Sequence, residues 1–121
     1  MAAGKTSKRV LLVDDEVAVR NLYQISLEQH GMVVFTASGV REGLQALHDL
    51  EFDVALVDLQ LTDGDGMQII RKLQRGGNGP KALAMSGFPV TDKMAQELKT
   101  QGVDFYSKME PMAELIRLIV K

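Results

Sequence analysis

The sequence of 121 residues predicts a single α/β domain in which helices cover both faces of one doubly wound parallel sheet. Short apolar segments alternate five times with amphipathic segments, and short connections join them. The most apolar segment, residues 54–57, has the composition of a strand that is buried on both faces. Right-handed crossovers would then place the carboxyl ends of all five strands at one edge of the sheet.

Two strand and helix pairs are expected before this central strand. Residues 9–13 form an apolar strand that stops at two aspartates, and residues 17–30 form a helix that Gly31 can end. That helix has two adjoining apolar stripes, which are Ala18, Leu22 and Ile25, and Val19, Tyr23 and Leu27. A strand over residues 32–37 is followed by Ser38, which can cap the second helix.

The same alternation continues from the central strand to the end of the chain. The central strand ends in Asp58, and polar, glycine-rich residues then form a turn. The later elements are a helix over 67–74, a loop over 75–80, a strand over 81–85, a helix that stops at Gly102, a strand over 103–106, and a last helix with Pro111 in its first turn.

Charge and composition limit the classes of partner. The 14 basic and 16 acidic residues give a net charge of −2, so we expect neither nucleic acid nor a membrane surface as a partner. The sequence has no cysteine, which excludes disulfides and thiolate metal sites. No apolar stretch approaches the roughly 20 residues that span a bilayer. We expect a cytoplasmic domain over residues 9–121 behind a flexible leader, residues 1–8.

Four of the five strands bring a polar or charged group to the same edge of the sheet. These groups are Asp14, Asp15, Asp58, Ser86 and Lys108. If the first and third strands are neighbours, three carboxylates meet, and like charges so close raise one another's pKa unless a cation neutralises them. Oxygen ligands without cysteine or paired histidine favour Mg²⁺ over Zn²⁺.

Each of these groups also has a simpler interpretation. Asp14 or Asp15 could cap the first helix, and Asp58 could be a turn residue. The combination, however, suits a phosphoryl group, because acids hold a divalent ion while a lysine and a hydroxyl bind anionic oxygens. A carboxylate can attack phosphorus to give an acyl phosphate, and Asp58 on the central strand is the better candidate for this nucleophile.

These residues resemble the receiver domain of two-component response regulators. The matching features are the run Val13-Asp14-Asp15-Glu16, Asp58 with Gly66 eight positions on, Met85-Ser86-Gly87, and Tyr106-Ser107-Lys108. The resemblance covers residues 9–120. It implies a flavodoxin-like (βα)5 sandwich with strand order 2-1-3-4-5, similar to that of the chemotaxis response regulator.

The resemblance implies a phosphoacceptor and a metal site. Asp58 would accept a phosphoryl group from a histidine of a partner kinase or phosphotransfer domain. Asp15, Asp58 and the main-chain carbonyl of Gln60 would ligate Mg²⁺ directly, while Asp14 would act through a water.

The resemblance also implies a switch. Ser86 and Lys108 would bind the phosphoryl oxygens, and Tyr106 would be the switch aromatic whose ring turns inward as Ser86 moves. Phosphorylation would bias two arrangements of the fourth helix, fifth strand and fifth helix, the face expected to meet an effector or a second copy of the chain.

The sequence departs from the family pattern directly after Lys108. The family usually has a proline there in a cis peptide, whereas this chain has Met109. A cis bond before a residue other than proline costs about 2.5 to 4 kcal/mol, so we expect the Lys108-Met109 bond to be trans. This difference bears directly on where the lysine side chain points.

Two other functions compete with a receiver. A Mg²⁺-dependent phosphatase with an aspartyl-phosphate intermediate generally has a second acid two residues after its nucleophile, where this chain has Gln60. A receiver-like interaction module that takes no phosphate does not need the acids, hydroxyl and lysine, yet all are present. We therefore expect a regulatory phosphoacceptor rather than an enzyme that turns over substrate.

Overall fold

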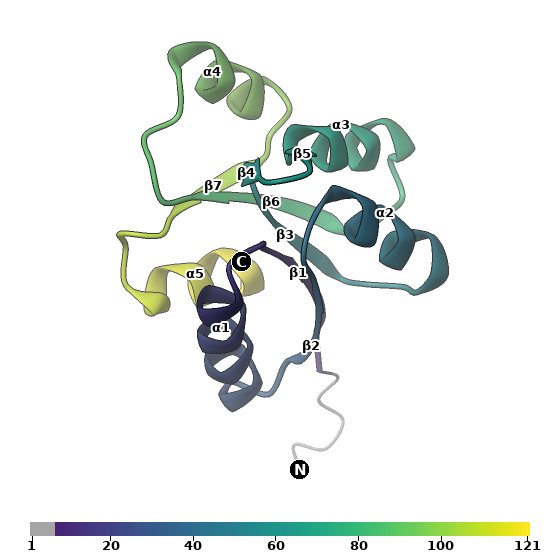
Figure 1. The fold of residues 1–121 in the computed structure, drawn as a ribbon, viewed down its shortest axis with the longest axis vertical. Helices are drawn as coiled ribbons and strands as arrows, with labels where there is room; N and C mark the ends of the chain where they lie inside the picture. The colour runs from purple at the N-terminus through teal and green to yellow at the C-terminus, as the bar shows by residue number, and fades with distance from the viewer. Residues whose placement is uncertain (1–6) are drawn as a thin grey trace.

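The computed structural model describes residues 7–121 and consists of one parallel sheet between two layers of helices (Figure 1). The strand order is β2-β1-β3-β6-β7, which is the expected 2-1-3-4-5 order once a small separate hairpin, β4-β5, is set aside. The prediction of a doubly wound, flavodoxin-like sheet is therefore confirmed. Most of the expected flexible leader, residues 1–6, lies outside the described residues.

The helices and strands match the predicted ones. Wherever the sequence predicted an end, the observed end lies within two residues of it. The strands of the main sheet are β1 (Arg9–Val13), β2 (Val33–Ala37), β3 (Val54–Asp58), β6 (Lys81–Ser86) and β7 (Asp104–Ser107). The helices are α1 (Val17–Gln29), α2 (Val40–Asp49), α3 (Met67–Gly76), α4 (Asp92–Thr100) and α5 (Met112–Val120). The unexpected hairpin pairs β4 (Gln60–Leu61) with β5 (Gly64–Asp65).

The sheet separates two apolar cores because successive strand residues point to opposite faces. Leu11 and Val13 of β1 pack under α2, α3 and α4, whereas Val10 and Leu12 pack under α1 and α5. Figure 1 shows these two helix layers on either side of the sheet. Among residues 7–121 no helix is both long and apolar enough to cross a membrane.

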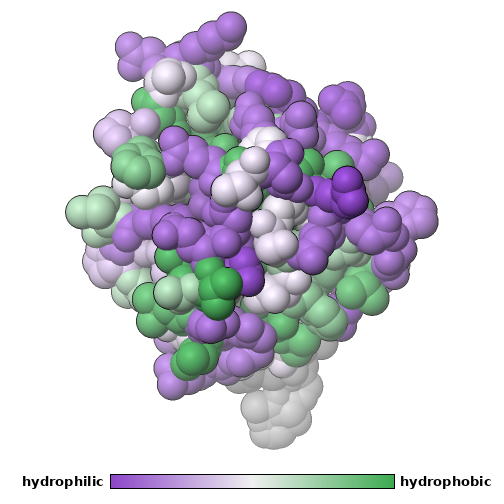
Figure 2. Space-filling model, in the orientation of Figure 1, coloured by the Kyte–Doolittle hydropathy of each residue, from purple (hydrophilic) through white to green (hydrophobic). Residues whose placement is uncertain are grey.

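Only one of the two apolar stripes of α1 packs against the sheet. Tyr23 and Leu27 are buried, whereas Leu22 is 58% exposed and Ile25 is 55% exposed. The two stripes point in different directions around the helix, so α1 cannot bury both against one surface. Figure 2 shows hydrophobic side chains among hydrophilic ones on the part of the surface where α1 and α5 lie.

The start of α2 differs from the prediction that Ser38 caps it. The cap position is Gly39, and the backbone N–H groups of Val40 and Arg41 donate to Asp63 Oδ1 and Oδ2 at 2.8 and 3.2 Å. The Ser38 hydroxyl donates instead to Glu42 Oε1 at 2.8 Å. A Cβ at Gly39 would lie 2.5 Å from Asp63 Oδ1, so the glycine makes room for this distant carboxylate.

We expect Asp63→Ala to lower the midpoint of urea unfolding near neutral pH, because α2 loses the acceptor at its first turn. The N–H donors of Val40 and Arg41 hold the pKa of Asp63 below its usual range. A lowered folded-state pKa stabilises the fold above the unfolded pKa, and this stabilisation is lost as the pH falls through the lowered value. The difference between variant and wild type should therefore disappear in acid. A difference of equal size at every pH would contradict this assignment.

Candidate functional site

The carboxyl edge of the sheet holds a group of buried polar residues. Asp14 directly follows β1, Asp58 ends β3, and Ser86 ends β6; their exposures are 0%, 4% and 2%. Lys108 directly follows β7, and its backbone N–H donates to the carbonyl of Ser86 at 2.9 Å. Because these strands are parallel neighbours, residues far apart in the sequence meet at this edge.

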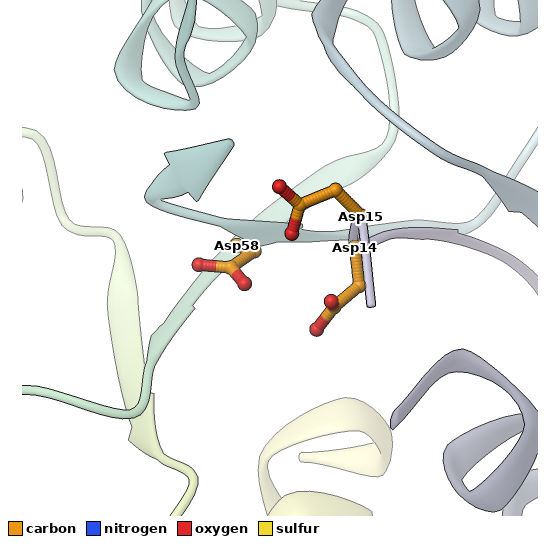
Figure 3. A group of neighbouring side chains, drawn as sticks. All are labelled: Asp14, Asp15 and Asp58. Atoms are coloured by element: carbon orange, nitrogen blue, oxygen red, sulfur yellow. The ribbon is translucent and has the colours of Figure 1, made fainter. Parts of the chain in front are cut away.

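Asp14, Asp15 and Asp58 form a carboxylate cluster (Figure 3). Each residue offers one carboxylate oxygen to the cluster, and these three oxygens all lie within 4.8 Å of one another. The expectation that three carboxylates meet at the sheet edge is confirmed. Asp14 and Asp58 are buried, whereas Asp15 is partly exposed and forms the outer side of the cluster.

Backbone N–H groups fix the direction of each carboxylate. Asp14 Oδ1 accepts from Glu16 at 2.9 Å, and Asp58 Oδ1 accepts from Gln60 at 2.8 Å. Asp15 Oδ2 accepts from the N–H of Thr62 at 2.9 Å, which joins the turn after β1 to the loop of the β4-β5 hairpin. Neither aspartate after β1 is the N-cap of α1, since that position is Glu16.

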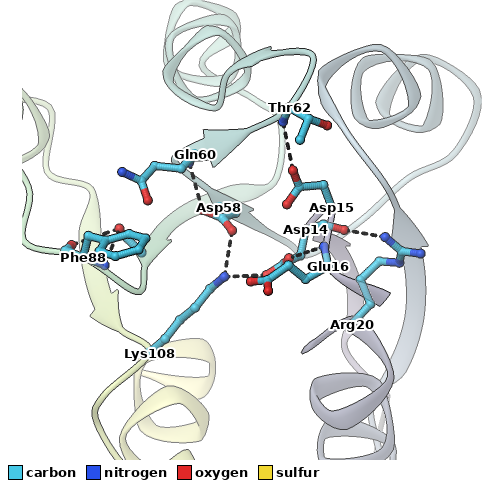
Figure 4. Close-up of polar contacts among 10 residues, drawn as sticks. Asp14, Asp15, Glu16, Arg20, Asp58, Gln60, Thr62, Phe88 and Lys108 are labelled. Carbon is cyan, nitrogen blue, oxygen red and sulfur yellow. Dashed lines mark hydrogen bonds and ion pairs between the residues drawn. The ribbon is translucent and has the colours of Figure 1, made fainter. Parts of the chain in front are cut away.

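Lys108 contacts the two buried carboxylates at once (Figure 4). Its Nζ lies 2.7 Å from Asp14 Oδ2 and 2.7 Å from Asp58 Oδ2, and its side chain is only 13% exposed. No peptide bond in the described part of the chain is cis, so the prediction of a trans Lys108-Met109 bond is confirmed. The lysine reaches the acids without the usual proline.

Burial and neighbouring charges shift the pKa values of Asp58 and Lys108. Burial raises the pKa of Asp58, although hydrogen bonds from Lys108 and Gln60 act in the opposite direction. Burial alone would lower the pKa of Lys108, but hydrogen bonds and charge from Asp14 and Asp58 outweigh it and raise that pKa. Lys108 therefore stays a fixed positive charge at neutral pH.

The donor set of the cluster fits a hard divalent cation. Its ligands are carboxylate oxygens, and three carboxylates facing one lysine leave a net negative charge for a cation to neutralise. Gln60 lies in β4, directly beyond the turn after Asp58. The use of its main-chain carbonyl as a ligand stays a prediction.

Ser86 is at the expected place, but its hydroxyl is turned toward its own loop. The Ser86 Oγ donates to the carbonyl of Phe88 at 2.9 Å and accepts from the N–H of Phe88 at 3.0 Å. The Phe88 side chain is 66% exposed beside the site. In this arrangement Ser86 holds the turn before α4 rather than an anion.

The position of Tyr106 does not suit a switch ring that moves inward from the surface. Its side chain is already 1% exposed and packs with Tyr23 on the face of α1 and α5. Its neighbour Phe105 packs on the opposite face with Val90, which precedes α4, and with Met94 of α4. The interpretation of Tyr106 as the switch residue of the α4 face is therefore not supported, and the ring on that face is Phe105.

Gly66 has a role that the sequence pattern alone does not reveal. A Cβ at this position would overlap the carbonyl oxygen of Asp58 and lie 2.9 Å from its carbonyl carbon. The backbone φ of Gly66 is −58°, which any residue can adopt, so the requirement is for space rather than conformation. The start of α3 therefore packs directly against the backbone that carries the candidate nucleophile.

Comparisons with known proteins place the chain in one family. A model described as the response regulator receiver domain matches residues 10–120. The KDP operon transcriptional regulatory protein KdpE of Escherichia coli (strain K12) is 35% identical over 106 residues, which are 88% of this chain and 47% of KdpE. The response regulator protein PilR of Pseudomonas aeruginosa is 28% identical over 112 residues, which are 93% of this chain and 25% of PilR.

A solved structure has the same fold over nearly the same length. The response regulator receiver domain protein (CheY-like) from Methanospirillum hungatei JF-1 is 27% identical, with a TM-score of 0.86, and the match covers 94% of this chain and 91% of that one. The chain spans less than half the length of the two curated relatives. The family model nevertheless spans all five helices and all of the main sheet except Arg9, the first residue of β1. The chain therefore belongs to the response regulator receiver domains, the phosphoacceptor signalling domains of two-component systems.

Proposed function

We propose that Asp58 is the residue that accepts the phosphoryl group, with Mg²⁺ held by the carboxylate cluster. The observation that carries this proposal is the contact of Lys108 Nζ with Asp58 Oδ2 at 2.7 Å, beside two further carboxylates. Asp14 also contacts the lysine but has no exposed surface, and Asp15 lies on the outer side of the cluster, whereas Asp58 contacts the lysine and is 4% exposed.

The chemistry needs little more than position and charge neutralisation. A carboxylate oxygen of Asp58 attacks phosphorus, the bond from phosphorus to the donor atom breaks, and the leaving group takes the electron pair. A bound Mg²⁺ would supply charge neutralisation for the phosphoryl oxygens. Lys108 exchanges its contact with Asp58 Oδ2 for a phosphoryl oxygen and keeps its contact with Asp14.

The switch proposed for this chain begins at Ser86. Its hydroxyl would leave the Phe88 carbonyl and donate to a phosphoryl oxygen, which releases the turn before α4. Phe105 is the aromatic ring on the α4 face, and it takes the place of Tyr106 in this scheme. The expected output surface remains α4, β7 and α5, which can bind an effector or a second copy of the chain.

The donor that we propose is a phosphorylated histidine of a kinase or phosphotransfer domain. The exposed apolar residues Val17, Leu22 and Ile25 of α1, the helix that follows the acid pair, support a protein donor. Since the histidine kinase that starts such a transfer takes the phosphoryl group from ATP, we place the chain in the cytoplasm. We propose a regulatory domain rather than a phosphatase, because Gln60 carries an amide where such enzymes need an acid.

Incubation with acetyl phosphate and Mg²⁺, followed by intact mass measurement, tests this function. A receiver gains one phosphoryl group, and it loses this gain in Asp58→Asn and after chelation of the metal. Steady release of phosphate from many substrates would indicate the phosphatase. No change in mass would indicate a module that acts without phosphorylation, and either of these two results would contradict the proposal.

A further inference from the structure

We infer that the buried phenols of Tyr106 and Tyr23 fix the loop that carries Lys108, so that Tyr106 is a positioning residue for phosphoryl transfer. This inference rests on the proposed role of Lys108 as the group that binds the phosphoryl oxygens. It assigns to Tyr106 a function different from that of a moving switch ring.

The loop between β7 and α5 is fixed at both of its ends. At the start, the Lys108 N–H donates to the Ser86 carbonyl at 2.9 Å. At the far end, the Tyr106 hydroxyl donates to the Glu110 carbonyl at 2.6 Å, and the Glu110 N–H donates to Ser107 at 2.9 Å. The Met109 side chain between them is 85% exposed, so side-chain packing does not hold the middle of this loop.

The Tyr106 ring is itself held by a helix that begins at the acid cluster. Its centroid lies 6.3 Å from that of Tyr23, at an interplanar angle of 71°, which is an edge-to-face contact. Tyr23 belongs to α1, which starts three residues after Asp14. The two rings thus connect the segment that carries the acids with the loop that carries the lysine.

Both phenols remain neutral and keep this contact over a wide pH range. They are 1% and 6% exposed, and burial raises the pKa of each. Tyr106 therefore stays protonated and continues to donate its hydrogen bond to the Glu110 carbonyl. The restraint on the loop therefore does not depend on a change in the charge of either phenol.

The position of the loop matters because Lys108 has a long side chain with two contacts of 2.7 Å. If its backbone shifted, the side chain would have to change conformation to keep Nζ in contact with both Asp14 and Asp58. In this chain no proline stiffens the bond directly after the lysine, since Met109 stands there and the next proline is Pro111. The hydroxyl of Tyr106 supplies that restraint by closing the loop onto the strand that precedes it.

The variant Tyr106→Phe tests the inference, because it removes the hydroxyl and keeps the ring. We expect the maximal rate of phosphorylation by acetyl phosphate to fall about tenfold, as suits the loss of one buried hydrogen bond that orients a reacting group. The acetyl phosphate concentration for half-maximal rate and the dissociation constant for Mg²⁺ should change less than about twofold, because the acids stay in place. Met109→Ala, a change in the same loop at an exposed side chain, is the matched control and should leave the rate unchanged.

Two further measurements separate positioning from general damage. In the background Lys108→Ala, Tyr106→Phe should cause no additional loss of rate, because it acts through the lysine. An equal loss in both backgrounds, or no loss in either, would overturn the inference. Amide hydrogen exchange of Lys108 should accelerate about tenfold in Tyr106→Phe and stay unchanged in Met109→Ala.

The exchange measurement does not depend on phosphorylation. If the wild-type chain takes no phosphoryl group but the exchange result holds, the proposed function fails and the tyrosine restraint on the loop stands. If phosphorylation proceeds and the exchange of Lys108 is the same in wild type and Tyr106→Phe, the restraint itself is refuted.

Discussion

Gly66→Ala is expected to destabilise the fold by about 3 kcal/mol and to reduce phosphorylation of Asp58 severely. The added Cβ would overlap the Asp58 carbonyl oxygen, and because the backbone fixes the position of both atoms, neither can rotate away. Relief requires α3 to move away from β3 or the end of β3 to shift. Either movement displaces the carboxylate that must meet the phosphorus, and misplacement by about 1 Å can cost a hundredfold in rate.

Urea unfolding and the rate of phosphorylation by acetyl phosphate measure the two effects of Gly66→Ala. Gly76→Ala is the matched control, because it lies at the other end of the same helix and a Cβ there would have nothing within 4 Å. That control should be neutral or slightly stabilising, since it removes a flexible glycine from a helix. If the two variants behaved alike, the close packing of Gly66 on Asp58 would not be a requirement of the site.

Lys108→Ala is expected to lower the rate of phosphorylation by a factor of about 100 to 1,000, the usual effect of removing one charged or polar group that stabilises a transition state. It should also destabilise the fold at neutral pH by about 3 kcal/mol, because Asp14 and Asp58 would remain buried without their shared cation. Mg²⁺ should then stabilise the variant more than it stabilises wild type, since the metal replaces the missing charge.

The pH dependence of Lys108→Ala has a definite sign. Without the lysine the Asp58 carboxylate is more easily protonated in the folded state, so its folded-state pKa, which burial already raises, rises further. A raised carboxyl pKa removes stability as the pH rises, so the deficit of the variant should shrink in acid. Lys72→Ala removes an equal charge from an exposed position on α3 and should show none of these effects. A variant at Lys108 with normal stability and normal phosphorylation would contradict the site.

The elements and the acid cluster could be predicted because both depend on local patterns. Alternation of apolar and amphipathic segments identified the strands, and the parallel sheet then required Asp14, Asp58 and Lys108 to share one edge. Strand periodicity also decides which face a ring occupies, but only once the register is known. Phe105 and Tyr106 are adjacent in the sequence, and this single step along the strand moves the ring from the α4 face to the face of α1 and α5.

The remaining features depend on contacts between residues far apart in the sequence. Asp63 accepts hydrogen bonds from the start of α2, more than 20 positions earlier in the sequence. The polar, glycine-rich segment that contains Asp63 predicts a turn but not this distant contact. The packing of Gly66 on the Asp58 carbonyl and the pairing of Tyr23 with Tyr106 likewise arise only when the layers assemble. Such contacts require the tertiary structure, because no local propensity specifies them.

The most direct test of the central claim is to locate the phosphoryl group within the chain. After incubation with acetyl phosphate and Mg²⁺, reduction with borohydride converts an aspartyl phosphate to homoserine, and peptide mass spectrometry identifies the converted residue. We expect conversion at Asp58 alone, and none when the metal is chelated. Conversion at Asp14 or Asp15, or a phosphoryl group that borohydride does not remove, would contradict the assignment of Asp58 as the phosphoacceptor.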